Sequence, residues 1–300
     1  MNWLVIGIGD ISRRRVIPAI LSEPRSRLHS IVTRDPSNAY YPGVQLHADL
    51  DAALADPRVD AVYVATPVWL HAAQSIASLR NGKHVLCEKP AALSFGDAVR
   101  MQQAAQARLL GIAYYRRLFT KLIDAKRRIA AGDIGTPVLI EANCHGWLPP
   151  TNRSWLLDPK LAGAGPLFDI ACHRIDAANF LFGEPARATG MLSNVVHQTS
   201  VEDSATVLID YVSGPRAVID VRWNSHVDRD QFRVIGTDGE INLSPLSAGE
   251  HANVHYPLIA NFVSACLGEE PLCCPIEESL KTDRVLSAVR LQQPLESVHT

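Results

Sequence analysis

Short apolar runs alternate with helical patterns between residues 3 and 115, and this alternation restricts the fold more than any other feature. The apolar runs are nearly continuous, which is typical of parallel strands buried on both faces. Strands that alternate with helices form a parallel sheet with helices on each side. We predict strands at 3–6, 28–33, 44–47, 61–65, 84–87 and 110–115, and helices at 11–21, 50–55, 68–81 and 94–108. The chain is therefore expected to be an α/β protein that begins with a doubly wound, dinucleotide-binding (Rossmann) domain.

The pattern changes near residue 118. After a predicted helix at 118–131, the apolar runs become longer and mixed with polar residues, and turn sequences separate several of them, as in antiparallel hairpins. These strands are predicted at 138–144, 205–212, 216–223, 232–235 and 240–243, and further helices at 167–182, 257–267 and 277–291. We therefore assign residues 1–118 to the Rossmann domain and residues 119–300 to a second domain.

Composition excludes several classes of protein. The 300 residues are 47% hydrophobic and 20% charged, with a net charge of -2, which gives no indication of a nucleic acid or a membrane surface as partner. The apolar runs are too short to span a bilayer, and the start of the chain predicts no signal peptide. Six scattered cysteines without a C-x-x-C pair indicate reduced thiols and a cytoplasmic protein. They are Cys87, Cys144, Cys172, Cys266, Cys273 and Cys274.

A glycine-containing turn, Gly7-Ile8-Gly9-Asp10-Ile11-Ser12, follows the first predicted strand and opens the first predicted helix. Glycines in this position allow a tight turn and a close approach of the backbone to a pyrophosphate. The N-terminus of the helix supplies N–H groups to the same anion. Ser12 replaces the third glycine of the usual fingerprint. In this strand–turn–helix context the motif indicates dinucleotide binding.

The end of the second strand reads Val32-Thr33-Arg34-Asp35. An acidic residue here usually binds the ribose 2′-hydroxyl of NAD, whereas an arginine accommodates the 2′-phosphate of NADP. The register of the second strand and the turn after it favour Arg34 as the residue that faces the ribose. The Thr33 hydroxyl could bind the same 2′-phosphate. This favours NADP over NAD, although Arg34 could also be an ordinary solvated charge.

Two later strands also end in polar residues. Thr66-Pro67 follows the fourth strand, where its backbone would border the nicotinamide, and His71 lies in the next helix as either a site residue or a packed one. Glu88-Lys89-Pro90 follows the fifth strand. Ligands bind at the carboxyl ends of strands in such sheets, so Lys89 is a candidate to meet cofactor and substrate. The alternative is a surface Glu-Lys pair.

Asp169 and His173 stand four residues apart in a predicted helix of the second domain, after the loop Gly163-Ala164-Gly165. At this spacing both side chains project from one face. A carboxylate beside an imidazole suits proton transfer near neutral pH, although such a pair can also merely stabilise a helix. We find no third ligand at zinc spacing and predict no metal site.

With these motifs in this order, the chain resembles the Gfo/Idh/MocA family (glucose-fructose oxidoreductase / inositol dehydrogenase) along nearly its whole length. Weaker similarities are Tyr115-Arg116-Arg117, Gly132-Asp133-Ile134-Gly135, Trp155 with Asp158-Pro159, Glu202-Asp203 and Ile235-Gly236-Thr237-Asp238-Gly239. The resemblance implies a second α/β domain with an open, largely antiparallel sheet that binds substrate and joins subunits into a homodimer or homotetramer. It also implies a Lys89-Pro90 bond that can be cis, and hydride transfer between nicotinamide and a hydroxyl-bearing carbon of a sugar or cyclitol.

The resemblance also implies roles for single residues. His173 would accept the proton of the substrate hydroxyl, Lys89 would hydrogen-bond the same oxygen, and Asp169 would orient the substrate or His173. Substrate contacts are expected at Lys89, Arg117, Trp155, Asp169 and His173. Cofactor contacts are expected at Gly7, Gly9, Asp10, Ile11, Ser12, Thr33, Arg34, Thr66, Pro67, His71, Glu88 and Lys89.

The chain departs from the family pattern at three places. Ala164 stands where a glycine is frequent, Leu156 follows Trp155 where many members have arginine, and the connection from residue 243 to 256 is short. A pocket lined by Trp147, Trp155 and Leu156 would be less polar than a typical sugar site. A dihydrodiol, a deoxysugar or a small cyclic ketone is therefore an alternative substrate.

Two other functions compete with an oxidoreductase. A non-catalytic dinucleotide-binding sensor or partner subunit would keep this fold, but it would not need both Lys89 and His173. Another Rossmann enzyme, such as a methyltransferase, would not be expected to carry Glu88-Lys89-Pro90 or the antiparallel second domain.

Overall fold

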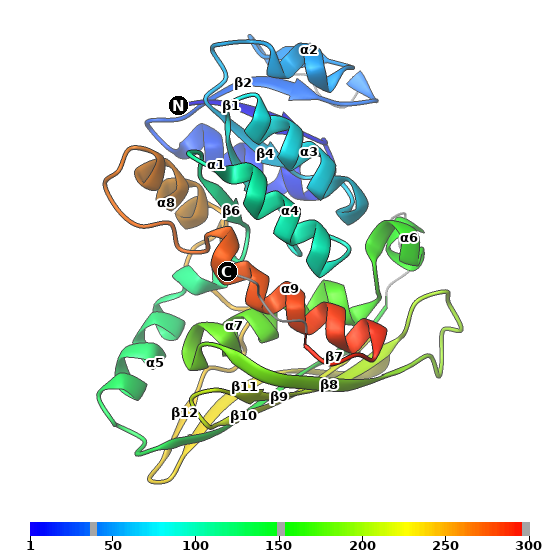
Figure 1. Ribbon diagram of the computed structural model, residues 1–300, viewed down its shortest axis with the longest axis vertical. Coiled ribbons are helices and arrows are strands. Elements are labelled where there is room, and N and C mark those ends of the chain that lie inside the picture. Colours follow the sequence, from blue (N-terminus) through cyan, green and yellow to red (C-terminus); the bar gives the residue numbers. More distant parts are fainter. Residues whose placement is uncertain (37–40, 149–153, 296–300) are drawn as a thin grey trace. The chain divides into compact units, whose positions relative to one another are not determined.

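The computed structural model of the chain describes residues 1–36, 41–148 and 154–295 (Figure 1). The chain forms two compact units, and neither is one continuous segment. The first unit contains Met1–Ala92, Gly96–Tyr115 and His251–Glu278; the second contains Leu93–Phe95, Arg116–Glu250 and the chain from Ser279 onward. A single boundary after residue 118 would assign His251–Glu278 to the second unit, whereas this segment packs within the first.

The first unit contains a six-stranded parallel sheet in the order β3-β2-β1-β4-β5-β6, which confirms the predicted doubly wound fold. Its strands are β1 (Asn2–Ile6), β2 (Arg27–Val32), β3 (Gln45–His47), β4 (Ala61–Val64), β5 (His84–Cys87) and β6 (Leu110–Ile112). The strand order reverses between β1 and β4, and ligands bind at such switch points in open α/β sheets. The side chains of β4 are all buried, as expected for a central strand with helices on both sides.

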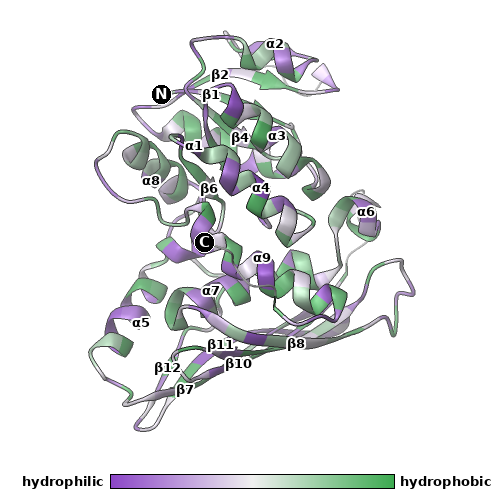
Figure 2. Cartoon of the chain, in the orientation of Figure 1, coloured by the Kyte–Doolittle hydropathy of each residue, from purple (hydrophilic) through white to green (hydrophobic). Residues whose placement is uncertain are grey.

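The helices of the first unit are η1 (Ser12–Val16, a π turn), α1 (Ile17–Ser22), α2 (Leu50–Leu54), α3 (Val68–Arg80), α4 (Phe95–Ala105) and α8 (Tyr256–Cys266). The predicted helix over 11–21 is present as one continuous helix, in which the π turn η1 runs directly into α1. Pro18 lies in the first turn of α1, where proline needs no N–H partner. The apolar α8, which is coloured as largely hydrophobic in Figure 2, belongs to this unit, and its Phe262 ring lies 5.3 Å from the ring of Trp3.

The second unit contains a six-stranded sheet in the order β12-β11-β7-β10-β9-β8. Its strands are β7 (Pro137–Trp147), β8 (Pro185–Ser193), β9 (Ser204–Tyr211), β10 (Arg216–Arg222), β11 (Asn224–Gly236) and β12 (Glu240–Asn242). Only β7 and β10 pair in parallel, so the expectation of a largely antiparallel sheet is confirmed. The sequence patterns missed β8 and found only the last part of β11.

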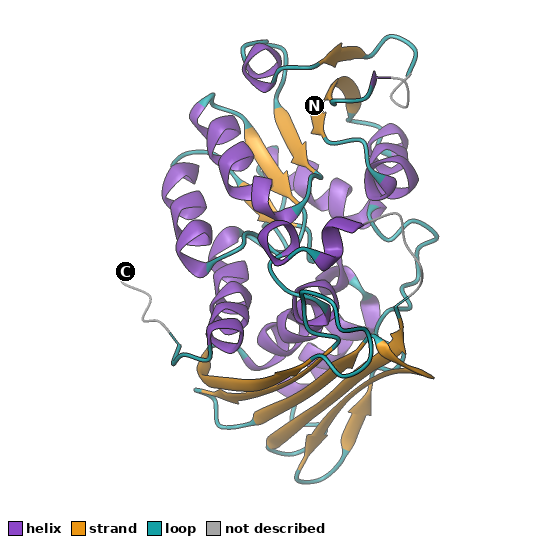
Figure 3. Ribbon diagram, turned by 90° about the vertical axis from the view of Figure 1, so that its right-hand side faces the viewer, coloured by secondary structure: helices purple, strands orange, loops and turns teal. Residues whose placement is uncertain are grey.

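The helices of the second unit lie over one face of this sheet (Figures 1 and 3). They include η3 (Tyr115–Leu118), α5 (Thr120–Ala130), η4 (Ser154–Leu157), α6 (Pro159–Ala162), η5 (Leu167–Ala171), α7 (Cys172–Phe182) and α9 (Ile276–Leu291). Over the described residues no helix covers the other face, which we call the open face. No helix of the described chain is long and apolar enough to cross a membrane.

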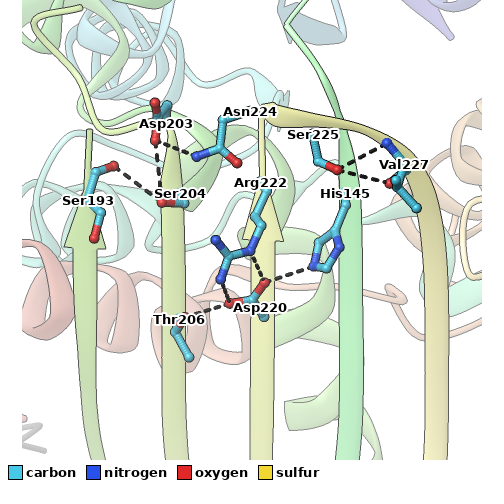
Figure 4. Close-up of polar contacts among 10 residues, drawn as sticks. All are labelled: His145, Ser193, Asp203, Ser204, Thr206, Asp220, Arg222, Asn224, Ser225 and Val227. Atoms are coloured by element: carbon cyan, nitrogen blue, oxygen red, sulfur yellow. Dashed lines mark hydrogen bonds and ion pairs between the residues drawn. The ribbon is translucent and has the colours of Figure 1, made fainter. Parts of the chain in front are cut away.

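A carboxylate links three neighbouring strands on the open face (Figure 4). Asp220 of β10 accepts the Thr206 hydroxyl of β9 at 2.6 Å and lies 2.8 Å from Nε2 of His145 on β7. Arg222 donates its Nε–H to the same carboxylate at 2.7 Å. The open face therefore carries a polar network that spans three adjacent strands.

A second carboxylate organises the connection between β8 and β9. Asp203 is 1% exposed, and its Oδ2 accepts the backbone N–H groups of Val195, Val196 and His197 at 3.0, 2.7 and 3.1 Å. Asn224 donates to Oδ1 at 2.8 Å (Figure 4). Burial alone would raise the pKa of Asp203, but the backbone N–H groups and the Asn224 amide lower it below the ordinary value.

Replacing Asp203 by asparagine is expected to destabilise the protein at pH 7 by about 2 kcal/mol, because hydrogen bonds to a buried charge are lost. The folded-state pKa lies below the unfolded-state value, so this stabilisation is complete above about pH 4 and disappears as the pH falls through the folded-state pKa. Thermal unfolding at pH 7 and pH 3 measures both effects, with the exposed Asp228→Asn as control. Equal melting temperatures of Asp203→Asn and wild type at pH 7 would refute the assignment.

Candidate active site

The glycine turn after β1 has the geometry that a dinucleotide needs. Gly7 has φ +91°, and a Cβ there would meet the carbonyl oxygen of Ala65 at 2.8 Å, so a side chain is excluded by both conformation and space. Gly9 differs, because a Cβ at this position would meet no protein atom within 4 Å. The open space above Gly9 is therefore available to a ligand that approaches the backbone.

The remaining residues of this turn shape it from within. Ser12 is fully buried and donates its hydroxyl to the carbonyl oxygen of Gly7 at 2.7 Å, so the residue in the third-glycine position closes the turn. Asp10 is exposed and forms an ion pair of 3.6 Å with Arg14. Ile11 lies directly before the π turn in helical conformation, with φ -62° and ψ -42°.

The end of β2 presents Arg34 to solvent. The Thr33 hydroxyl is buried and engaged with the backbone of Asp35, donating to its carbonyl at 3.2 Å and accepting its N–H at 3.1 Å. This turn leaves the side chains of Arg34 and Asp35 exposed at the strand end. Both residues are thus in place for the choice between NADP and NAD that the sequence left open.

His71 connects two of the predicted cofactor segments. Its ring is 1% exposed, with Nδ1 2.9 Å from the carbonyl oxygen of Pro90 and Nε2 2.8 Å from that of Thr66. Both partners only accept hydrogen bonds, so a neutral ring donates to one of them. Burial lowers the pKa of His71, while these carbonyls and the Glu88 carboxylate oppose the shift. This geometry makes His71 a link between the Thr66-Pro67 and Lys89-Pro90 turns.

The segment Glu88-Lys89-Pro90 follows β5 directly, and the Lys89-Pro90 bond is cis, as the resemblance implied. The Glu88 carboxylate faces inward. Its Oε1 accepts the hydroxyl of Tyr63 at 2.7 Å and lies 3.4 Å from Nε2 of His255, while Oε2 accepts the N–H of Lys89 at 3.2 Å. Glu88 therefore has three partners within its own unit, whereas the sequence suggested a contact to the cofactor.

The charge state of this cluster follows from its surroundings. Burial alone would raise the pKa of Glu88, but hydrogen bonds from His255 and Tyr63 and the charge of Lys89 lower it below the ordinary value. Burial and the adjacent carboxylate raise the pKa of Tyr63 far above its usual range. The Tyr63 hydroxyl therefore stays protonated and donates its hydrogen bond to Glu88, whose carboxylate is ionised.

In the second unit, Asp169 and His173 lie on one continuous helix formed by η5 and α7. The first turn is a π turn, in which the N–H of Cys172 donates to the carbonyl of Leu167 five residues earlier. Asp169 is half-buried and His173 is 7% exposed. Irregular π turns are frequent at functional sites, so this helix combines the predicted proton-transfer pair with such a turn.

The start of this helix is held by Glu202, which precedes β9. Its Oε1 accepts the N–H of Leu167 at 3.0 Å, one of the N–H groups that a helix N-terminus leaves unpaired. Gly165 runs directly against Glu202, since a Cβ on Gly165 would lie 2.1 Å from the Glu202 carbonyl oxygen. Burial raises the pKa of Glu202, and the N–H groups of Gly165 and Leu167 oppose that shift. Glu202 therefore fixes the loop that leads into the helix carrying Asp169.

Arg117 has a structural partner where the sequence suggested a substrate contact. Its guanidinium donates to both carboxylate oxygens of Asp176, with distances of 2.8 and 3.1 Å, and both side chains are nearly inaccessible. Its carbon Cζ also lies 5.6 Å from the ring centroid of Phe180. The pair therefore joins η3 to α7 inside the second unit, which argues against contact with substrate.

The predicted aromatic lining is divided. Trp155 lies half-buried in η4, and the adjacent Leu156 is buried. Trp147 lies two residues after His145 in β7, so both side chains are on the open face. The Trp147 ring stacks on His226, with 3.9 Å between ring centroids. This directs Trp147 away from the helices that carry Asp169 and His173. The neighbouring Pro149 and Pro150 lie outside the described residues.

Sequence patterns missed three residues that support the predicted site: Tyr63, Glu202 and His255. Tyr63 looks like an ordinary apolar strand residue, and His255 is 167 residues from its partner Glu88. Glu202 was noticed only as part of a weak similarity. Its place three residues before a predicted strand gave no local signal of a contact to Leu167, 35 residues earlier in the chain.

Comparisons with known proteins agree with this geometry. Residues 1–112 match the model of an oxidoreductase family with an NAD-binding Rossmann fold, and residues 122–242 match the GFO/IDH/MocA C-terminal domain. A 1,5-anhydro-D-fructose reductase from Ensifer adhaerens is 32% identical over 248 residues, which cover 80% of this chain and 74% of the relative. A D-xylose 1-dehydrogenase (NADP(+)) from Haloferax volcanii is 28% identical over 253 residues, covering 82% and 76%.

A solved structure of an aldose-aldose oxidoreductase from Caulobacter crescentus, complexed with glycerol, has a TM-score of 0.87 at 24% identity and covers 99% of each chain. Fold, glycine turn and family models together define an oxidoreductase that uses a nicotinamide dinucleotide. The chain belongs to the Gfo/Idh/MocA family.

The two glycines of the turn are expected to respond differently to alanine. Gly7→Ala should lower the melting temperature markedly, because the Cβ collides with backbone at a positive φ. Gly9→Ala should leave the melting temperature unchanged but weaken dinucleotide binding at least tenfold, because the methyl group occupies the ligand's approach. Calorimetry and a fluorescence titration with NADPH and NADH measure the two effects. Wild-type affinity for both nucleotides in Gly9→Ala would contradict binding at this turn.

Proposed function

We propose that the protein is an NADP-preferring enzyme that interconverts a hydroxyl and a carbonyl group in a sugar, a cyclitol or a related small cyclic molecule. The observation that carries this proposal is the exposed Arg34 at the end of β2, in the same unit as a glycine turn with open space above Gly9. The general activity is that of the family, and the cofactor preference, residue roles and substrate class are proposed for this chain.

The residues present fit a dinucleotide. The turn of residues 7–12 and the N-terminus of η1 would hold the pyrophosphate, Arg34 and Thr33 the 2′-phosphate, and the Thr66-Pro67 and Lys89-Pro90 turns the nicotinamide end. The nicotinamide supplies a hydride donor or acceptor when it is bound. The protein supplies orientation and proton transfer.

We assign the proton chemistry to His173, Lys89 and Asp169. His173 accepts the proton of the substrate hydroxyl during oxidation and returns it during reduction. Lys89 donates a hydrogen bond to the same oxygen and stabilises the negative charge that develops there. Asp169, one helical turn before His173, orients the substrate or the imidazole. Supporting these roles, Lys89 follows β5 in a turn fixed on both sides, and Glu202 fixes the start of the helix that carries the pair.

The substrate class is drawn from the relatives and from the residues around Trp155. One relative is named for reduction of an anhydro-ketose and another for oxidation of a pentose, which supports a sugar or sugar-derived carbonyl. Leu156 stands where many members carry arginine, so we favour a substrate with few hydroxyl groups. A screen of cyclic ketones and deoxysugars with NADPH, beside full sugars and cyclitols with NADP, tests this preference.

We also propose a homodimer or homotetramer joined through the open face, supported by its polar network of Asp220, His145 and Arg222. A monomeric mass in light scattering would refute it. The cytoplasmic location is proposed from the six scattered cysteines of the sequence, which include no C-x-x-C pair. Titration of six thiols in protein isolated without reductant would support that location, whereas disulfides would contradict it.

Replacing Arg34 by alanine is expected to raise the Kd for NADPH about 10- to 100-fold while leaving that for NADH within twofold, because a charge-assisted contact to the 2′-phosphate is lost. Nicotinamide fluorescence measures both constants. Arg80→Ala, at the exposed end of α3, is the matched control. Equal losses for the two nucleotides, or tighter binding of NADH by the wild type, would reject the NADP preference.

Lys89→Met and His173→Ala are expected to lower kcat by about 10²–10⁴-fold, the usual contribution of a positioned acid or base. Both variants should still bind NADPH, which separates a loss of chemistry from a loss of cofactor. Lys126→Met and His226→Ala, at exposed positions, serve as controls. Full turnover by either Lys89→Met or His173→Ala on an identified substrate would refute its assigned role.

A further inference from the structure

Residues 252–255, which we call the link, connect the end of the second unit's chain to α8 but contact two site elements of the first unit. Arg15 of η1 donates from Nη1 to the carbonyl oxygen of Ala252 at 2.8 Å. Asn253 returns a hydrogen bond from Nδ2 to the carbonyl oxygen of Arg15, also at 2.8 Å. The link is thus anchored to the helical turn that begins with the glycine motif.

The other end of the link carries His255, which is 2% exposed. Its backbone N–H donates to Oδ1 of Asn253 at 3.1 Å, so the residue that contacts Arg15 also orients His255. The imidazole lies against Tyr115, with 4.9 Å between ring centroids, and its Nε2 faces the Glu88 carboxylate. His255 thereby contacts Glu88, the residue that directly follows β5.

Glu88 joins this contact to the backbone of Lys89. Tyr63 holds Oε1 from β4, His255 approaches the same oxygen from the link, and Oε2 accepts the Lys89 N–H. On the far side of Lys89, His71 lies against the Pro90 carbonyl. Tyr63 and His255 therefore orient the Glu88 carboxylate, and this carboxylate accepts the backbone N–H of Lys89.

We propose that His255 and Tyr63 are positioning residues for Lys89, acting through Glu88, and that the link sets the spacing between the Lys89 turn and the glycine turn. The proposal deepens the function proposed above, because it rests on Lys89 as the residue that contacts the substrate oxygen. The short connection between residues 243 and 256, noted as a departure from the family, delivers His255 to this place in this chain.

Single variants test the contacts in the protein without cofactor. Hydrogen exchange of the Lys89 amide, followed by NMR, should accelerate at least tenfold in His255→Ala and in Tyr63→Phe, because the carboxylate that accepts this N–H loses its orientation. His255→Gln should recover most of the protection, since the amide N–H can replace Nε2–H. His251→Ala, an exposed histidine of the same unit, should exchange like the wild type. Unchanged exchange in both His255→Ala and Tyr63→Phe would overturn the proposal.

A double-mutant cycle tests the catalytic consequence. His255→Ala and Tyr63→Phe are each expected to lower kcat about tenfold, with the Kd for NADPH changed less than twofold and with recovery in His255→Gln. In a Lys89→Met background the same changes should have no further effect on kcat, because residues that act through one another are not additive. A further tenfold loss in that background would show a general structural role and overturn the proposal.

The cycle separates this inference from the proposed function. If Lys89→Met retains turnover, the proposed role of Lys89 fails, while the exchange data still decide whether His255 and Tyr63 orient its backbone. If Lys89→Met is inactive but both positioning variants keep wild-type kcat and exchange, only the present inference fails. If His255→Ala and Tyr63→Phe lose NADPH affinity tenfold with kcat unchanged, Glu88 serves the cofactor and the inference is overturned.

Discussion

The close approach of Gly7 to the carbonyl oxygen of Ala65 is the contact on which the first unit's site depends. It brings the turn after β1 against the residue that follows β4, at the place where the strand order reverses. A side chain there would separate the two strand ends. The segments that follow β4 and β5 are in turn connected by His71 through hydrogen bonds to the carbonyl oxygens of Thr66 and Pro90. The second unit repeats the principle where Gly165 meets Glu202.

Local pattern predicted the first unit well, since parallel strands buried on both faces leave near-continuous apolar runs. It failed at β8, where Gly190 resembles a turn residue. In the structure a Cβ at Gly190 would lie 2.7 Å from Val289 of α9, so this glycine allows a helix to pack on the strand. It also failed for the first part of β11, whose exposed polar side chains carry little apolar signal.

The site was predicted as far as its residues carry their own local motif. Lys89 and the pair Asp169 and His173 were found because strand ends and helical spacing are visible in sequence. Arg117 shows the limit of that reasoning, because a cation in a motif can serve a buried ion pair such as that with Asp176. The supports of the site could not be found this way. Glu88 depends on a histidine 167 residues away, and only the folded chain brings them together.

Both site helices begin with a π turn, η1 after the glycine motif and η5 before His173. A π turn contains one residue more than the α-helical ladder requires, so the helix accommodates an extra residue there without a break. Loss of residue 170 or 171 would shorten the spacing from Asp169 to His173 from four residues to three, a difference of about 100° around the axis of a regular helix. Such a deletion would place a different side chain one helical turn before His173 and would keep the helix itself. Chain length within a single turn is thus a route by which this scaffold can acquire a different chemistry.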